Sequence, residues 1–257
     1  MKVLRHEEFN ETCAAQCNGP YENRWSKTMV GYGNESTHFV IELTYNYGVK
    51  SYELGNEFGG VTIKSKDVIT AVKAKSVPHE QQADGSILIH APDGYKFFII
   101  NDTAAADEDP IKFIIYNVCN LANSTGFWNG ILNMQPVRQD SKSALLSYNG
   151  GRFGIQFTQI AEKIDRKQAF GRIAFGVPYD TQPNIDNLIQ KNKKTILTPL
   201  VTLDTPGKAS VRVIILADPD GHEICFVDNE GFDQLSAVDP QAEPDLDKFI
   251  KKDPFQD

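Results

Sequence analysis

The chain repeats one sequence pattern, and this repeat limits what it can fold into. Three phrases recur in the same order after spacings that differ slightly: FVIELT (39–44) and FGIQFT (153–158), FGGVTI (58–63) and FGRIAF (170–175), and APDGYKFFII (91–100) and DPDGHEICFV (218–227). A repeat of roughly 100 residues is far longer than the units of solenoid proteins. The pattern therefore indicates a duplicated domain.

The second copy contains more than the first. A strand-like IKFIIYNV (111–118) and a helix-like ANSTGFWNGILN (122–133) precede MQPVRQD (134–140), which matches MKVLRHE at 1–7. Nothing in the first copy corresponds to this strand and helix. Two interpretations remain open, namely a truncated or alternative start and a genuinely shortened domain.

Apolar periodicity and turn residues predict mixed α+β structure. Many strands are separated only by hairpin turns, which favours mixed sheets over a doubly wound parallel sheet. Each copy corresponds to two β-α-β-β-β modules, so the chain would contain four, and the first of the four lacks its opening strand and helix. The predicted strands are 2–8, 25–31, 38–45, 61–63, 87–90, 96–100, 111–118, 137–139, 144–148, 152–158, 172–176, 197–203, 210–216 and 223–227, and the predicted helices are 67–75, 123–133 and 184–193.

These elements predict a first domain at 1–105, a second at 110–230 and an acidic tail at 231–257. Pro199 makes the strand at 197–203 the least certain, and it suits an edge strand because proline cannot donate to a sheet. Pro240, Pro244 and Pro254 among many acids predict a peripheral or partly mobile tail.

The net charge of −8 disfavours nucleic acid and anionic membrane surfaces as partners, since both need a basic face. Arg5, His6, Glu7 and Glu8 follow Met1-Lys2-Val3-Leu4, and no signal peptide is recognisable. We therefore expect an intracellular protein, cytoplasmic or alternatively mitochondrial. The spacing of the four cysteines matches no zinc ribbon or redox pair. Cys13 and Cys17 could form a metal site or a disulfide, but free thiols are favoured.

Several phrases resemble the metal-dependent glyoxalase I family, among them VIELTYNYGVKSYELG (40–55), KVLRHEEF, MVGYG and DPDGHEICF. The resemblance implies tandem vicinal-oxygen-chelate (glyoxalase-like) domains of paired β-α-β-β-β modules. It also implies isomerisation of the hemithioacetal of methylglyoxal and glutathione by a divalent metal, often Zn²⁺ or Ni²⁺. Each site would join a first-type module of one domain to a second-type module of the other.

The residues at the family's ligand positions mostly cannot bind such a metal. One composite site combines Glu42 with Arg172 and Cys225, while its opening-strand ligand is missing. The other site has only uncharged residues, and we expect it to be inactive: Gly60, Phe98, Phe113 and Gln156. A catalytic metal site of this type needs about three protein ligands and one open position.

No catalytic residue is assigned. Glu42 is the candidate, either as a general base or as the one metal ligand that remains. A carboxylate in an apolar strand is costly unless it is paired, so we expect Arg172 to bind Glu42 in place of the metal. Asn46 matches a residue that holds glutathione in the family, although an ordinary loop role is as plausible. Cys225 is interpreted as a ligand-site residue or, preferably, as a buried core thiol.

The leading functional hypothesis is a glyoxalase-like protein whose metal site is largely degraded. Such a protein would need no cofactor and would bind a small metabolite, a glutathione conjugate or a protein partner. One alternative is a lactoylglutathione lyase with non-standard coordination of Zn²⁺ or Ni²⁺. Another is a purely structural or interaction protein.

Overall fold

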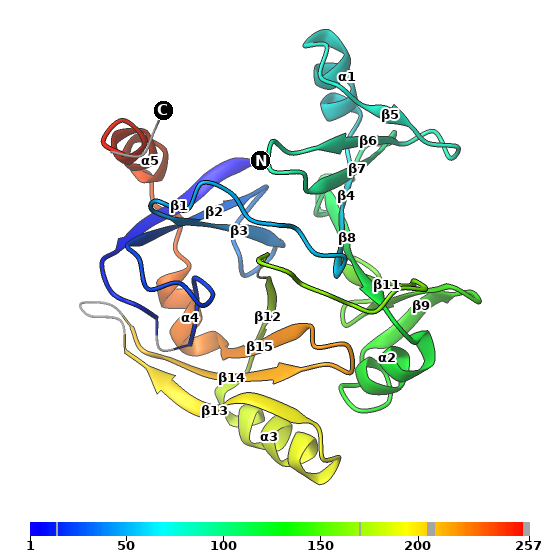
Figure 1. Ribbon diagram of the computed structural model, residues 1–257, viewed down its shortest axis with the longest axis vertical. Helices are drawn as coiled ribbons and strands as arrows, with labels where there is room; N and C mark the ends of the chain where they lie inside the picture. The colour runs from blue at the N-terminus through cyan, green and yellow to red at the C-terminus, as the bar shows by residue number, and fades with distance from the viewer. Residues whose placement is uncertain (14, 170, 205–208, 254–257) are drawn as a thin grey trace. The chain divides into compact units, whose positions relative to one another are not determined.

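The computed structural model describes residues 1–13, 15–169, 171–204 and 209–253 (Figure 1). Contacts between Cα atoms divide the chain into two compact units. Unit 1 combines Met1–Tyr52 with Phe170–Asp257, and unit 2 is Glu53–Ala169. Each unit therefore contains one module from each of the two sequence copies.

Unit 2 is built on one eight-stranded sheet with the order β5-β6-β7-β4-β8-β11-β10-β9. In each of its modules the opening strand lies parallel to the last strand, β4 to β7 and β8 to β11. The two opening strands pair with each other in antiparallel fashion and so join the modules into one sheet. Its strands are β4 (Phe58–Lys64), β5 (Glu80–Gln81), β6 (Ile87–His90), β7 (Lys96–Ile100), β8 (Ile111–Val118), β9 (Gln135–Gln139), β10 (Ser143–Ser147) and β11 (Gly154–Gln159).

Two helices of unit 2, α1 (Lys66–Ala74) and α2 (Leu121–Trp128), begin at side-chain caps. The Ser65 and Asn120 side chains accept hydrogen bonds from backbone amides of the first turn, which otherwise have no partner inside the helix. Helix α2 buries Trp128 completely against the sheet, where its ring lies 5.4 Å from that of Phe157 on β11. Capping and burial together explain why this short helix forms.

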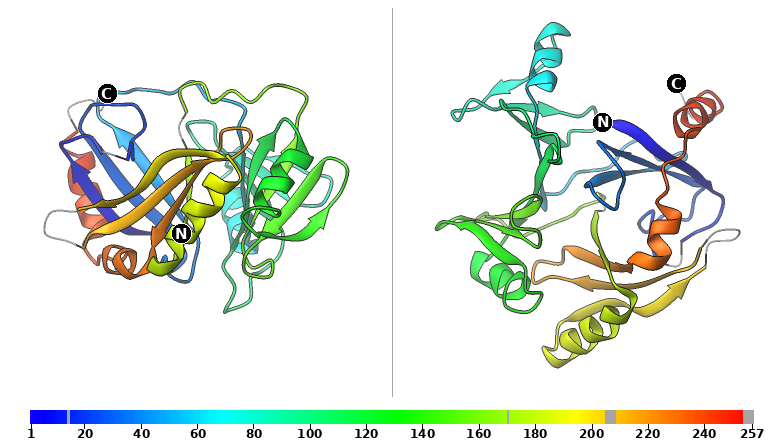
Figure 2. Two further views of the ribbon diagram at one scale, coloured as in Figure 1. Left: turned by 90° about the horizontal axis from the view of Figure 1, so that it is seen from below. Right: turned by 180° about the vertical axis from the view of Figure 1, so that it is seen from behind.

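Unit 1 has two separate sheets, which Figure 2 shows in blue and in yellow to orange. The first has the order β1-β2-β3 and the second the order β12-β15-β14-β13. Proline-containing β13 is an edge strand with register shifts between Ile196 and Val201, which confirms the expectation from Pro199. The strands are β1 (Lys2–Phe9), β2 (Trp25–Gly31), β3 (Val40–Asn46), β12 (Arg172–Val177), β13 (Thr195–Leu203), β14 (Val211–Ala217) and β15 (Glu223–Asp228).

The described part of unit 1 also contains four short helical segments, and the last two lie largely within the segment predicted to be a peripheral or partly mobile tail. They are the 3-10 helix η1 (Tyr179–Thr181), α3 (Gln182–Lys191), α4 (Asn229–Leu235) and α5 (Ala242–Ile250). Helix α5 packs on β1, where the Phe249 ring lies 5.6 Å from His6 and the Asp239 amide donates to the Leu4 carbonyl. This packing on β1 stabilises the helix although the segment is rich in proline and acidic residues. None of the described helices is long and apolar enough to cross a membrane.

Candidate functional site

One face of the four-stranded sheet of unit 1 is covered by the loop after β1. Ala15, only 5% exposed, packs against buried Val213, Ile215, Cys225 and Val227 of β14 and β15. Small apolar side chains at alternate strand positions create this face, because successive residues of a strand point to opposite sides. The loop therefore occupies the sheet surface on which Cys225 lies.

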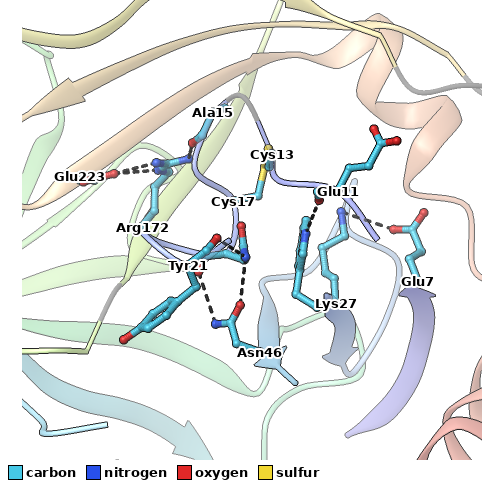
Figure 3. Close-up of a disulfide and its surroundings, with 12 residues drawn as sticks. Glu7, Glu11, Cys13, Ala15, Cys17, Tyr21, Lys27, Asn46, Arg172 and Glu223 are labelled. Carbon is cyan, nitrogen blue, oxygen red and sulfur yellow. Dashed lines mark hydrogen bonds and ion pairs between the residues drawn. A yellow bond between two sulfur atoms is a disulfide. The ribbon is translucent and has the colours of Figure 1, made fainter. Parts of the chain in front are cut away.

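A disulfide closes this loop on either side of the buried alanine. Cys13 and Cys17 are bonded to each other, with Cα atoms 5.5 Å apart, and both pack against the same apolar cluster (Figure 3). The prediction of two free thiols is therefore wrong. A separation of four residues lets the chain turn back far enough for the sulfur atoms to meet, which the sequence spacing alone did not establish.

Arg172 lies beside this loop and binds Glu223 (Figure 3). Its Nε and Nη2 donate to Glu223 Oε2 at 3.0 and 2.8 Å, and its Nη1 donates to the Ala15 carbonyl at 2.9 Å. The strand register explains the pair, because Arg172 opens β12 directly opposite Glu223 on the parallel strand β15. The Arg172 and Glu223 side chains are only 18% and 9% exposed.

Glu42 does not form the predicted pair with Arg172. Among the described residues no hydrogen bond or ion pair joins the two, and Glu42 is exposed. The prediction assumed that an apolar strand must be buried, but β3 is the edge of its sheet and its carboxylate reaches water. Glu42 still lies near the site, since its negative charge contributes to raising the pKa of Cys225.

Cys225 is a core thiol rather than a reactive group. It is 8% exposed, and burial is the main reason that its pKa is raised to about 12, against a smaller opposing effect of Arg172. A thiol is a nucleophile only as its thiolate, so this environment makes the group inert near neutral pH.

We expect a thiol reagent to discriminate sharply between the two cysteines that lie outside the disulfide, Cys119 and Cys225. Iodoacetamide at pH 8 should modify exposed Cys119 in the native protein and should modify Cys225 only after unfolding. Mass spectrometry of the digested protein after timed quenching measures both sites, and a Cys119→Ser variant supplies the background. Comparable labelling rates for the two thiols in the native state would contradict the core assignment.

Asn46 is buried, and its side-chain amide forms hydrogen bonds with other residues of unit 1. Its side-chain nitrogen donates to Tyr52 Oη at 2.9 Å and to the Asn18 carbonyl at 3.3 Å, while its oxygen accepts from Asn18 Nδ2 at 2.9 Å. The residue thereby ties the loop of the disulfide to the segment after β3. A contact between Asn46 and glutathione stays a prediction.

The second predicted site lies on the central strands of unit 2. Gln156 accepts a hydrogen bond from Arg138 Nη2 at 2.5 Å, and the guanidinium of Arg138 lies 5.4 Å from the centre of the Phe113 ring. Sequence comparison missed Arg138, although it is the cation that β9 places next to these residues. Gly60 adopts φ +136°, and a Cβ there would lie 2.7 Å from the Lys96 carbonyl oxygen. A histidine ligand at this position would require the backbone to move.

Neither set of positions provides the donors that a catalytic metal requires. Within the described residues, no three histidine, cysteine, aspartate or glutamate side chains group together as a possible metal site. In unit 1 a guanidinium and an unreactive thiol stand at two positions where the resemblance implies ligands, and in unit 2 the four such positions are Gly60, Phe98, Phe113 and Gln156. The residues present therefore do not fit the metal that the resemblance implies.

Comparisons with known proteins agree with one another on the family. A family model for the C-terminal domain of glyoxalase domain-containing protein 4-like proteins matches residues 120–235. The chain is 46% identical to glyoxalase domain-containing protein 4 of Mus musculus over 255 residues, which are 98% of this chain and 85% of that one. It is also 46% identical to glyoxalase 1 of Caenorhabditis elegans over 254 residues, which are 98% of this chain and 88% of that one.

More distant relatives extend the comparison. A lactoylglutathione lyase of Arabidopsis thaliana is 27% identical over 255 residues, covering 90% of this chain and 84% of its own. The crystal structure of glyoxalase I from Zea mays matches with a TM-score of 0.70 and 24% identity, covering 90% of this chain and 84% of that one. This last similarity shows the fold.

Proposed function

The chain belongs to the family of glyoxalase domain-containing protein 4, and from its site residues we propose that it acts by binding a partner rather than as a metal-dependent lactoylglutathione lyase. One observation carries the proposal. The guanidinium of Arg172, at the position where the resemblance implies a metal ligand, is held by Glu223 and by the Ala15 carbonyl. A permanently charged cation cannot ligate a divalent metal and repels one nearby.

A protein partner fits unit 1 better than a small metabolite. The loop that carries Ala15 already covers the sheet face on which Cys225 lies, so a metabolite could reach that face only if the loop moved. The edge strand β3 instead exposes large apolar side chains, Leu43 at 52% and Tyr45 at 40%. Exposed apolar side chains that stand together on one element are typical of surfaces that contact other proteins.

The lyase remains the second candidate because Glu42 retains a carboxylate at a ligand position. Lactoylglutathione lyases are also among the relatives with 27% identity. In that case Zn²⁺ or Ni²⁺ would polarise the substrate oxygens, and Glu42 would be the residue of this chain that holds it.

Elemental analysis together with a turnover assay separates the two candidates. We expect the purified protein to contain far less than one equivalent of Zn²⁺ or Ni²⁺ and to show no turnover of methylglyoxal with glutathione above background. Maize glyoxalase I, purified and assayed in the same way, is the positive control. One equivalent of metal, with turnover that chelation abolishes and that Glu42→Gln removes, would establish the lyase instead.

A further inference from the structure

The loop after β1 is held at both ends, and the disulfide lies between the two attachments. At one end Trp25 Nε1 donates to the Glu11 carbonyl at 3.0 Å. At the other end the buried Asn18 side chain donates to Asn46 Oδ1 at 2.9 Å. Between these attachments lie the disulfide and Ala15, whose side chain packs on the sheet face formed by β14 and β15 (Figure 3). The residues that cover this face therefore belong to a short segment with fixed ends.

The backbone between the two cysteines has a conformation that needs a constraint. Gln16 adopts φ +52°, in the left-handed region that residues with a Cβ rarely occupy. Its amide donates to the Cys13 carbonyl at 2.8 Å and so closes a turn. The disulfide from Cys13 to Cys17 spans this turn. Breaking the disulfide would free Gln16 to return to the extended or right-handed helical regions, and the turn would open.

The short span of the disulfide limits its effect to this turn. Its cysteines are separated by four positions in the sequence. A disulfide restricts the unfolded chain less when it closes a shorter loop, so this one adds less to overall stability than a bond between distant segments would. The sheet beneath the loop is held by its own strand pairing, β13 with β14 and β14 with β15. Reduction should consequently open the turn and leave the sheet folded.

A thiol in solution can reach this disulfide. Cys13 and Cys17 are only partly buried, whereas Cys225 in the same apolar cluster is 8% exposed. Exchange begins when a thiolate attacks a disulfide sulfur, so its rate depends on access to that sulfur, and exposed disulfides are the more easily reduced ones. The structure thus places an accessible disulfide next to a face that the loop makes inaccessible.

We propose that Cys13 and Cys17 form a reversible disulfide, and that its reduction by a low-molecular-weight thiol uncovers the apolar face of β14 and β15. One thiolate attacks a sulfur of the pair, forms a mixed disulfide with that cysteine and releases the other cysteine as a thiolate. A second thiolate attacks the sulfur of the reductant in the mixed disulfide and releases the second cysteine. The pair gains two electrons and two protons, and two molecules of the reductant are oxidised to their disulfide. A disulfide of the same class reverses these steps and closes the turn again.

Reduction would change which surface unit 1 presents. The covered face contains Val213, Ile215 and Val227, which are buried while the loop lies on them. Exposed together, these apolar side chains form a surface that is available for binding only in the reduced protein. Cys225 lies in the same cluster, so access of a reagent to its sulfur reports whether the face is covered. The proposal goes beyond the partner-binding function and does not depend on it.

Labelling of Cys225 measures the opening of the loop. In a Cys119→Ser background, the oxidised protein is compared with a Cys13→Ser/Cys17→Ser variant, which cannot form the disulfide. Both are treated with iodoacetamide at pH 8, and mass spectrometry of the digested protein follows the peptide that contains Cys225. We expect labelling to be at least about tenfold faster in the serine variant, because the reagent reaches the thiol only when the loop is open. Equal rates would overturn the proposal.

Hydrogen exchange distinguishes an open loop from an unfolded sheet. In the serine variant we expect faster exchange in the peptide that contains residues 15–19, where the Gln16 and Gly19 amides close the turns of the loop. Protection in β14 and β15 should stay unchanged. Loss of protection in both strands would show that the disulfide holds the sheet together, and would overturn the proposal.

Reduction of the original chain tests reversibility. After treatment with glutathione and without denaturant, Cys13 and Cys17 should become alkylated by iodoacetamide, and they should resist alkylation again once oxidised glutathione is added. Reduction that requires denaturant, or two thiols that never pair under oxidising conditions, would overturn the proposal. These measurements involve neither a partner nor a metal, so their failure would leave the proposed partner-binding function unaffected.

Discussion

Replacing Phe157 by alanine should lower the free energy of unfolding of unit 2 by about 3–5 kcal/mol. Its side chain is fully buried, with ring centres 5.4 Å from Trp128 and 6.5 Å from Tyr116. Truncation removes this apolar contact and leaves a cavity that the rigid sheet and helix α2 can close only in part. The same change at the counterpart position, Leu43→Ala, should alter stability by less than about 0.5 kcal/mol because Leu43 is 52% exposed.

Hydrogen exchange measured by mass spectrometry separates these effects by unit. Phe157→Ala should accelerate exchange of amides in β10 and β11, while Leu43→Ala should leave protection in β2 and β3 close to that of the original chain. Local exchange is preferable to one thermal midpoint because a chain with two units need not unfold in one step. Similar losses of protection for the two variants would mean that Leu43 on β3 is as well buried as Phe157 on β11.

The duplication made much of this fold predictable from the sequence. Repeated phrases placed equivalent strands in both halves, and the turn residues at 92–94 and 219–221 separated strands that the structure pairs. Pro199 correctly indicated an edge strand, since β13 is the last strand of its sheet. These features could be predicted because strand alternation and proline geometry are local properties, which a short stretch of sequence determines.

Side-chain partners in the candidate site were less predictable. Sequence comparison placed Arg172 near Glu42 and Cys225, but not in the ion pair with Glu223 that the structure shows. Which carboxylate a guanidinium meets depends on the register of β12 with β15, and a shift of one residue would exchange the faces. The burial of Glu42 was overestimated for a related reason, since burial depends on a neighbouring strand and not on the apolar character of β3 alone.

Arg172→Ala should destabilise unit 1 by about 3 kcal/mol, the lower end of the cost of breaking a buried ion pair. The change removes two hydrogen bonds to Glu223 and one to the Ala15 carbonyl. The Glu223 side chain, 9% exposed, then loses its cation while water reaches it poorly. Residual solvation at Arg172, which is 18% exposed, places the expected cost at the lower end of the range. Arg138→Ala is the matched control, because Arg138 is exposed and should contribute little.

The double variant Arg172→Met/Glu223→Met distinguishes an ion pair from simple packing. If the cost of Arg172→Ala arises from leaving Glu223 without its cation, removing both charges should restore most of the lost stability. Purely additive losses from the two single methionine variants would instead indicate that each side chain acts through its own packing. Chemical denaturation monitored together with exchange in β12 and β15 supplies the values for the cycle. If the double variant regains most of the lost stability, Arg172 stabilises the protein by neutralising Glu223. If Arg172→Ala is as stable as the original chain, the guanidinium is not a fixed cation at the position where the resemblance implies a metal ligand.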